Sequence, residues 1–83
     1  MSSFQQAVNF ANSQKSKKNL PNDQLLQLYS HYKQGELGVC NVSEPSKLQF
    51  KEHAKWKAWK SLGNMSKSEA QSKYVEMVNK WLK

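Results

Sequence analysis

The chain of 83 residues contains no arginine, a single cysteine and no long apolar run. Cys40 has no partner for a disulfide within the chain, and no set of Cys, His and carboxylate residues has the spacing of a zinc site. We therefore predict no metal and a reducing compartment. No apolar stretch approaches the about 20 residues that span a bilayer, and the first residues lack the pattern of a secretory signal. These absences predict a cytoplasmic protein without an integral membrane segment.

The positive charge of the chain comes from lysine alone. Thirteen lysines against six acidic residues give a formal net charge of +7, which predicts a polyanionic partner. Lysine binds phosphate as a compact point charge, whereas readout of DNA base edges relies on the bidentate fork of arginine. The composition therefore favours a phosphorylated small molecule over sequence-specific DNA binding.

Caps and apolar periodicity predict four helices and no strand. The first begins at Ser3, an N-cap whose capping box closes at Gln6, and ends in the lysine-rich segment 15–19. The second opens at residues 21–22. It stops at Gly35 and Gly38, because glycine is the usual residue after a helix end.

The third predicted helix covers residues 50–62 and halts at Gly63, and the fourth begins at Ser66 with a capping box to Glu69. The connection from residue 35 to about residue 49 is long for a helical bundle. Short connections force neighbouring helices to be antiparallel, whereas a long one permits a crossover. We therefore expect the second and third helices to run parallel, which would bring their basic residues to one rim.

Two short clusters combine aromatic and lysine side chains. In the segment 29–34, Tyr29, Tyr32 and Lys33 stand at i, i+3 and i+4, so their tips can share one helical face. In the segment 54–59, Lys55 precedes Trp59 by four residues, which places a cation beside an aromatic stripe. Taken singly, these aromatic residues are most simply explained as core. Together the clusters suit a ligand that carries both phosphate and a flat ring.

The strings Tyr-x-x-Tyr-Lys-Gln at 29–34 and Ala-Lys-Trp-x-Ala-Trp at 54–59 resemble, in this order and separation, the acyl-CoA-binding protein family. The resemblance spans about residues 4–78. It implies an all-α, up-down-down-up four-helix bundle, with residues 1–83 as a single acyl-CoA-binding domain. It also implies a monomeric intracellular carrier and pool former that holds a medium- to long-chain fatty acyl-CoA in a surface groove, without catalysis or a cofactor.

The resemblance also assigns the residues that would hold the nucleotide end of the ligand. By matching position, Tyr29, Lys33 and Lys55 would hold the ribose 3′-phosphate of coenzyme A. Tyr32 would stack near the adenine, and Tyr74 would complete the site from the fourth helix.

The acyl chain is expected to lie along Val8, Leu25 and Leu26, and Ser30 and His31 complete the set of site residues implied by the resemblance. The first helix departs from the family pattern. Asn12 falls near a position that often contributes a basic residue to the phosphates, and the first lysine is Lys15. The contact of this helix with the phosphates is therefore expected to be either missing or displaced.

Other functions remain open at this point. A small basic nucleic-acid binder would use the segment 55–60 as its contact surface, and its affinity would fall steeply with salt. An interaction module would need further residues, and no nucleophile, base and orienting group can be assembled for an enzyme. The exposed lysines are expected to form a solvated face that attracts an anionic ligand or membrane, and transient contact with membranes or with acyl-CoA-using enzymes stays open. These lysines are Lys47, Lys51, Lys57 and Lys60.

Overall fold

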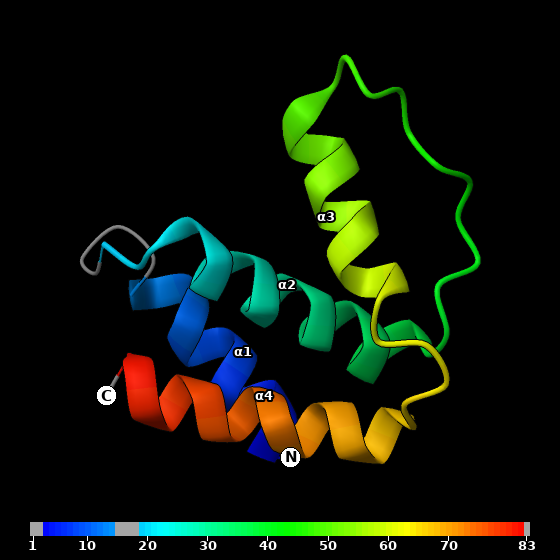
Figure 1. The fold of residues 1–83 in the computed structure, drawn as a ribbon. Coiled ribbons are helices and arrows are strands. Elements are labelled where there is room, and N and C mark those ends of the chain that lie inside the picture. Colours follow the sequence, from blue (N-terminus) through cyan, green and yellow to red (C-terminus); the bar gives the residue numbers. More distant parts are fainter. Residues whose placement is uncertain (1–2, 15–18, 83) are drawn as a thin grey trace.

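The computed structural model describes residues 3–14 and 19–82, and within these ranges it contains four helices and no strand (Figure 1). The helices are α1 (Ser3–Gln14), α2 (Asn22–Leu37), α3 (Phe50–Lys60) and α4 (Lys67–Trp81). The predicted all-α architecture is confirmed. The predicted end of the first helix, in segment 15–19, lies largely outside the described residues.

Several helix ends follow the sequence signals, whereas α3 ends at Lys60, two residues before the predicted end at Leu62. The Ser66 hydroxyl accepts a hydrogen bond from the Glu69 N–H at 3.0 Å, so the predicted N-cap of α4 is confirmed. Gly38 ends α2 with a φ of 88°, a conformation that glycine adopts without steric cost. Ser3 is itself the first residue of α1, so its prediction as the N-cap is wrong.

The prediction that Gly35 stops the second helix is also wrong, because α2 continues through it to Leu37. This glycine is buried where α2 meets α1 and α4. A Cβ atom at this position would lie 2.9 Å from Gln71 Cγ and 3.1 Å from Phe4 Cζ, and the Gln71 amide donates to the Gly35 carbonyl at 2.8 Å. The glycine therefore allows a close approach of three helices.

Gly35→Ala tests this packing against helix propensity. In an exposed helix interior this substitution would stabilise the protein by about 1 kcal/mol. Here the added methyl group overlaps Phe4 and Gln71, and overpacking costs about 1 to 3 kcal/mol. We expect a net loss of stability, measured as a lower urea midpoint. Ser68→Ala, at an exposed position of α4, is the control, and a midpoint raised by Gly35→Ala would contradict the assignment.

Residue pairs along the helices give the up-down-down-up topology. Tyr32 and Tyr74 have ring centroids 6.2 Å apart, while Gly35, one turn further along α2, bonds to Gln71, one turn earlier in α4. These two helices are therefore antiparallel. The contacts between α2 and α3 advance C-terminally along both helices, from the pair Tyr29 and Lys55 onward. The predicted parallel direction is thus confirmed, although α3 is steeply inclined to α2 (Figure 1).

The hydrophobic core joins α1, α2 and α4. It is built from the apolar stripe of α1 together with Leu28 of α2 and residues of α4 and its end. Its buried members are Phe4, Ala7, Val8, Ala11, Leu28, Tyr74, Val78 and Leu82.

Helix α3 is attached to the C-terminal half of α2 by polar contacts. Trp59 is only 4% exposed, as predicted for a core residue, and its indole N–H donates to the Gly38 carbonyl at 3.0 Å. The fully buried Gln34 donates from Nε2 to the carbonyls of Gly63 (3.1 Å) and Met65 (2.7 Å), which fixes the turn between α3 and α4. These contacts determine where Lys55, further back along α3, meets α2.

Candidate functional site

A cavity of about 430 Å³ lies between α1, α2 and α4. Its apolar lining is Val8, Ala11, Leu20, Leu25, Leu28 and Leu82. Its polar lining is Asn12, Tyr29, Tyr32, Lys33, Lys55 and Tyr74, of which Lys55 is the residue contributed by α3. The cavity lining therefore combines apolar side chains with phenols and ammonium groups. Such a lining suits an amphipathic ligand.

Two ammonium groups lie near the ring of Tyr29. Lys33 Nζ lies 5.9 Å and Lys55 Nζ 5.3 Å from the ring centroid, and Lys33 Nζ also lies 6.0 Å from the ring of Trp59. Within the described part of the chain, neither ammonium forms an ion pair. Ammonium groups without a counter-ion attract anions, and phosphate oxygens accept hydrogen bonds from them.

The phenol of Tyr29 stays protonated at neutral pH. Burial raises its pKa above 10.0, and the negative charge of Glu52 and the neighbouring Cys40 add to this effect. The neutral hydroxyl is available as a hydrogen-bond donor to an anionic ligand, beside the two ammonium groups.

Tyr32 and Tyr74, which both line the cavity, form an aromatic cluster with Phe4. The Phe4 ring lies 5.5 Å from that of Tyr74 in an edge arrangement and 6.2 Å from that of Tyr32 in a stacked one. A hydrogen bond to Glu36 is the main cause that raises the pKa of Tyr32, and burial adds to it. Burial raises the pKa of Tyr74 from 10.0 to about 12, and the nearby Tyr32 contributes less.

The raised pKa of Tyr74 predicts a pH dependence of stability. A group whose pKa is higher in the folded state stabilises the fold below its unfolded pKa and loses that contribution as the pH rises to the folded value. We expect stability to fall between pH 10 and about 12. Denaturant midpoints across this range should fall less steeply for Tyr74→Phe, which also controls for lysine deprotonation. Equal slopes for the two proteins would contradict the assignment.

Most of the residues predicted from the sequence meet at this cavity. Those that line it are Val8, Leu25, Tyr29, Tyr32, Lys33, Lys55 and Tyr74. The structure therefore brings together Tyr29, Lys33 and Lys55 of the predicted phosphate site. Tyr29 and Lys55 are on different helices and are 26 positions apart in the sequence.

Leu26, Ser30 and His31 do not line the cavity. Ser30 and His31 are buried, the Ser30 hydroxyl donates to the Gln27 carbonyl at 3.0 Å, and His31 Nδ1 lies 2.7 Å from the same oxygen. Leu26 and Ser30 are one turn apart and so share a different face of α2 from Tyr29 and Lys33. A contiguous motif on a helix cannot direct all of its residues to one side.

The cavity also has members that were not predicted as site residues. Ala11 and Leu28 belong to apolar stripes that periodicity identifies, but a stripe does not distinguish core from cavity wall. Leu20 and Leu82 lie just outside the helices, before α2 and after α4, where no periodic signal selects them. Asn12 lines the cavity as a neutral side chain of α1.

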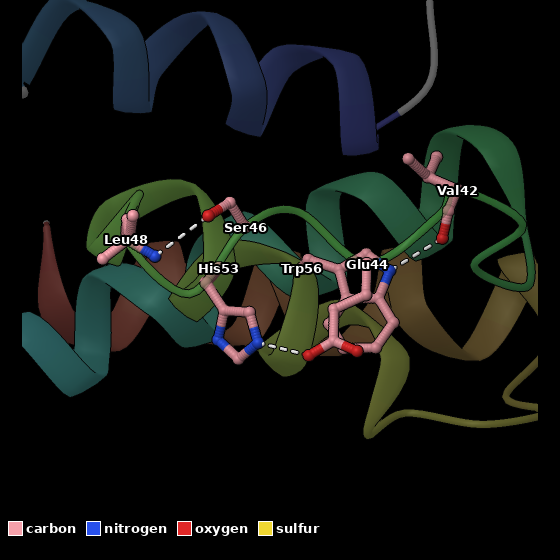
Figure 2. A network of polar contacts seen from close by, with 6 residues as sticks. All are labelled: Val42, Glu44, Ser46, Leu48, His53 and Trp56. Atoms are coloured by element: carbon pink, nitrogen blue, oxygen red, sulfur yellow. Dashed lines mark hydrogen bonds and ion pairs between the residues drawn. The ribbon is translucent and has the colours of Figure 1, made fainter.

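The loop between α2 and α3 is bonded to α3 at two places (Figure 2). The Trp56 indole N–H donates to the Val42 carbonyl at 2.7 Å, so Trp56 anchors the loop and does not line the cavity. His53 Nε2 lies 2.6 Å from Glu44 Oε2, and this hydrogen bond lowers the pKa of Glu44. These bonds give the long connection a defined course over α3.

Within residues 3–14 and 19–82, no three His, Cys, Asp or Glu side chains gather in a group that could hold a metal ion. None of the helices in that part of the chain has the length and apolar character to cross a membrane.

The fold and the site together define a class: a small helical protein with a cavity lined by apolar side chains, tyrosines and two lysines. The model of the family described as acyl CoA binding protein matches residues 1–78, and the chain belongs to this family. The chain is 50% identical over 56 residues to the acyl-CoA-binding protein of Dictyostelium discoideum, which covers 68% of this chain and 67% of the relative.

Longer relatives and solved structures agree with this assignment. The chain is 47% identical over 58 residues, 70% of its length, to human acyl-CoA-binding domain-containing protein 6, but the match spans only 21% of that relative. The crystal structure of Oryza sativa acyl-CoA-binding protein 2 aligns with a TM-score of 0.83 and 30% identity, over 98% of this chain and 91% of that one. The solution structure of the acyl CoA binding protein from Babesia bovis T2Bo aligns with a TM-score of 0.79 and 36% identity, over 98% and 93% of the chains.

Proposed function

We propose that residues 1–83 form a single domain that binds medium- to long-chain fatty acyl-CoA esters. The observation that carries this proposal is that the ammonium groups of Lys33 and Lys55 lie 5.9 Å and 5.3 Å from the Tyr29 ring centroid, in the lining of a largely apolar cavity. We call Tyr29, Lys33 and Lys55 the rim. Membership of the acyl-CoA-binding protein family supports it. In this proposal the protein is a monomeric, cytoplasmic carrier that maintains a pool of the ester and catalyses no reaction.

The rim would select the nucleotide. The ribose 3′-phosphate accepts hydrogen bonds from Lys33, Lys55 and the Tyr29 hydroxyl, and each charge-assisted bond contributes about 1.5 to 3 kcal/mol. Tyr32 lies beside the adenine, and Tyr74 closes the site from α4. These polar contacts distinguish a CoA ester from a free fatty acid, because the free acid has no phosphate to offer the rim.

The apolar wall would hold the tail. Val8 and Leu25 provide part of this wall, and Leu25 is 44% exposed, so it has apolar surface for a ligand to cover. Burial contributes about 0.8 kcal/mol per methylene, or on the order of 10 kcal/mol for a chain of about 16 carbons before ordering costs are subtracted. The tail would therefore dominate affinity and the rim specificity.

The remaining predicted residues would act on the site through α2. Ser30 and His31 both bond to the Gln27 carbonyl and so stabilise the helical turn between Leu28 and Tyr32. We assign them a positioning role. Leu26 lies outside the cavity and is half-buried, so its part in ligand binding is limited to the packing of α2.

The geometry gives little support to the alternative of nucleic-acid binding through segment 55–60. That function needs aromatic faces on which bases can stack. Trp59 is buried against α2, and the indole of Trp56 is bonded to the loop. Trp59 is therefore closed to stacking, and Trp56 is half-buried.

Calorimetric titration with acyl-CoA esters of graded length tests the proposal, with free CoA and a DNA oligonucleotide as controls. Affinity should rise with acyl length and level off once the cavity is filled. Free CoA should bind much more weakly, and DNA binding should be weak and strongly reduced by salt. Equal affinities for free CoA and palmitoyl-CoA would contradict the proposal.

A further inference from the structure

Two large apolar side chains are left in solvent where the loop enters α3. Leu48 is 86% exposed and Phe50 79%, whereas the other exposed large hydrophobic residues range from 44% to 53%. Lysines flank this pair on both sides, at positions 47 and 51. We propose that Lys47, Leu48, Phe50 and Lys51, which we name the α3 tip, form a docking surface for an anionic lipid leaflet.

The α3 tip is held in place by local bonds. The Ser46 hydroxyl accepts from the Leu48 N–H at 3.2 Å, and the Gln49 N–H donates to the Ser46 carbonyl at 3.0 Å. The contact of His53 with Glu44 then ties the segment before the tip to α3 (Figure 2). Leu48 and Phe50 are therefore exposed at a hydrogen-bonded turn and at the start of a helix.

The charge around the tip matches an anionic surface. Residues 41–60 contain five lysines and two glutamates, and Glu44 is paired with His53. Apolar side chains insert into the boundary between headgroups and acyl chains, while flanking lysines extend their ammonium groups to the headgroups. Anionic lipids attract such lysines by about 1 kcal/mol each near the surface. The arrangement of the α3 tip has both components.

The shape favours a membrane over a protein partner. The N-terminal end of α3 stands away from the other three helices, with the loop arching back from it (Figure 1). A stable protein interface needs about 800 Å² on each partner, which two apolar side chains cannot supply, whereas a bilayer accepts a small convex insertion. Neither Leu48 nor Phe50 lines the cavity, so the tip is separate from the ligand site.

Docking at the tip would bring the cavity rim close to the leaflet. Lys55 follows Phe50 by five residues on the same helix, a rise of about 7.5 Å. An acyl-CoA leaving the membrane would then reach the rim over a short distance. This use rests on the proposed function, but lipid docking itself can be measured without any acyl-CoA.

Vesicle co-sedimentation of the ligand-free protein tests the docking surface. The probes are vesicles of phosphatidylcholine alone and of phosphatidylcholine with phosphatidylserine in equal amounts. We expect binding to the anionic vesicles, and Leu48→Ala/Phe50→Ala should reduce the partition coefficient by about tenfold or more. Lys47→Gln/Lys51→Gln should remove most of the preference for phosphatidylserine.

The matched control is Leu37→Ala/Val39→Ala, which removes two apolar side chains that are 53% and 52% exposed at the other end of the loop. This control should bind vesicles as the parent protein does. Wild-type protein that ignores both kinds of vesicle, or equal losses in the two apolar variants, would overturn the proposal. Palmitoyl-CoA affinity measured without vesicles should be unchanged in Leu48→Ala/Phe50→Ala, and a loss there instead would assign these residues to the ligand site.

Discussion

Replacing Lys33 and Lys55 together by alanine is expected to weaken palmitoyl-CoA binding by about 100-fold or more, with a nearly unchanged melting temperature. Each substitution removes a charge-assisted contact of about 1.5 to 3 kcal/mol. Every 1.4 kcal/mol of binding free energy corresponds to a factor of about ten in the dissociation constant. The apolar wall of the cavity stays intact. The affinity that remains should therefore depend on acyl length as it does in the parent protein.

Calorimetry of the single and double variants measures this effect. Lys57→Ala and Lys60→Ala remove exposed lysines of the same helix that do not line the cavity, and they control for general electrostatic attraction. We expect each control to change affinity by less than either site variant. Should the controls match the site variants, the lysines would act only by long-range attraction. If Lys33→Ala unfolds the protein, its role is structural.

Gln34→Ala is expected to cause the largest loss of stability, about 3 kcal/mol. The side chain is fully buried and makes two hydrogen bonds to the turn after α3, each worth about 1 kcal/mol, and its removal also leaves a cavity. For a domain of this size, 1 kcal/mol corresponds to about 4 to 8 °C in melting temperature. Chemical and thermal unfolding should both report the change.

Two comparison variants separate the causes of this loss. Gln34→Leu fills the space without the hydrogen bonds, and it also removes the Gln34 Oε1 atom, which is buried and has no hydrogen-bond partner among the described residues. Its loss should be smaller than that of Gln34→Ala. Gln71→Ala removes one bond to Gly35 and should cost about 1 kcal/mol. A Gln34→Ala protein as stable as Gln71→Ala would show that the turn is held by other contacts.

Local signals in the sequence predicted the helices well because those signals act within a few residues. The cap at Ser66 and the end at Gly38 need only the chain around them. The prediction at Gly35 was wrong because this glycine is needed for tertiary packing. It lets Phe4 and Gln71, on other helices, approach α2 closely. Helix propensity carries no information about such an approach.

The part of the site that lies within one helix could be predicted from local spacing, whereas the part that joins two helices could not. The spacing of Tyr29, Tyr32 and Lys33 fixes a shared face, but the meeting of Tyr29 with Lys55 depends on how α3 is seated against α2. That seating relies on Gln34 and on Trp59, which are contacts between distant positions. The contacts that hold the loop likewise join residues without a periodic relation, so no pattern in the sequence indicated them.

The most direct test of the rim and cavity account compares palmitoyl-CoA with its analogue that lacks the 3′-phosphate, on wild-type protein and on Lys33→Ala/Lys55→Ala. The wild type should bind the analogue at least about tenfold more weakly than palmitoyl-CoA. The double variant should bind both ligands with equal affinity, because the groups that recognise the phosphate are gone. A wild type that does not distinguish the two ligands, or a double variant that still does, would contradict the account.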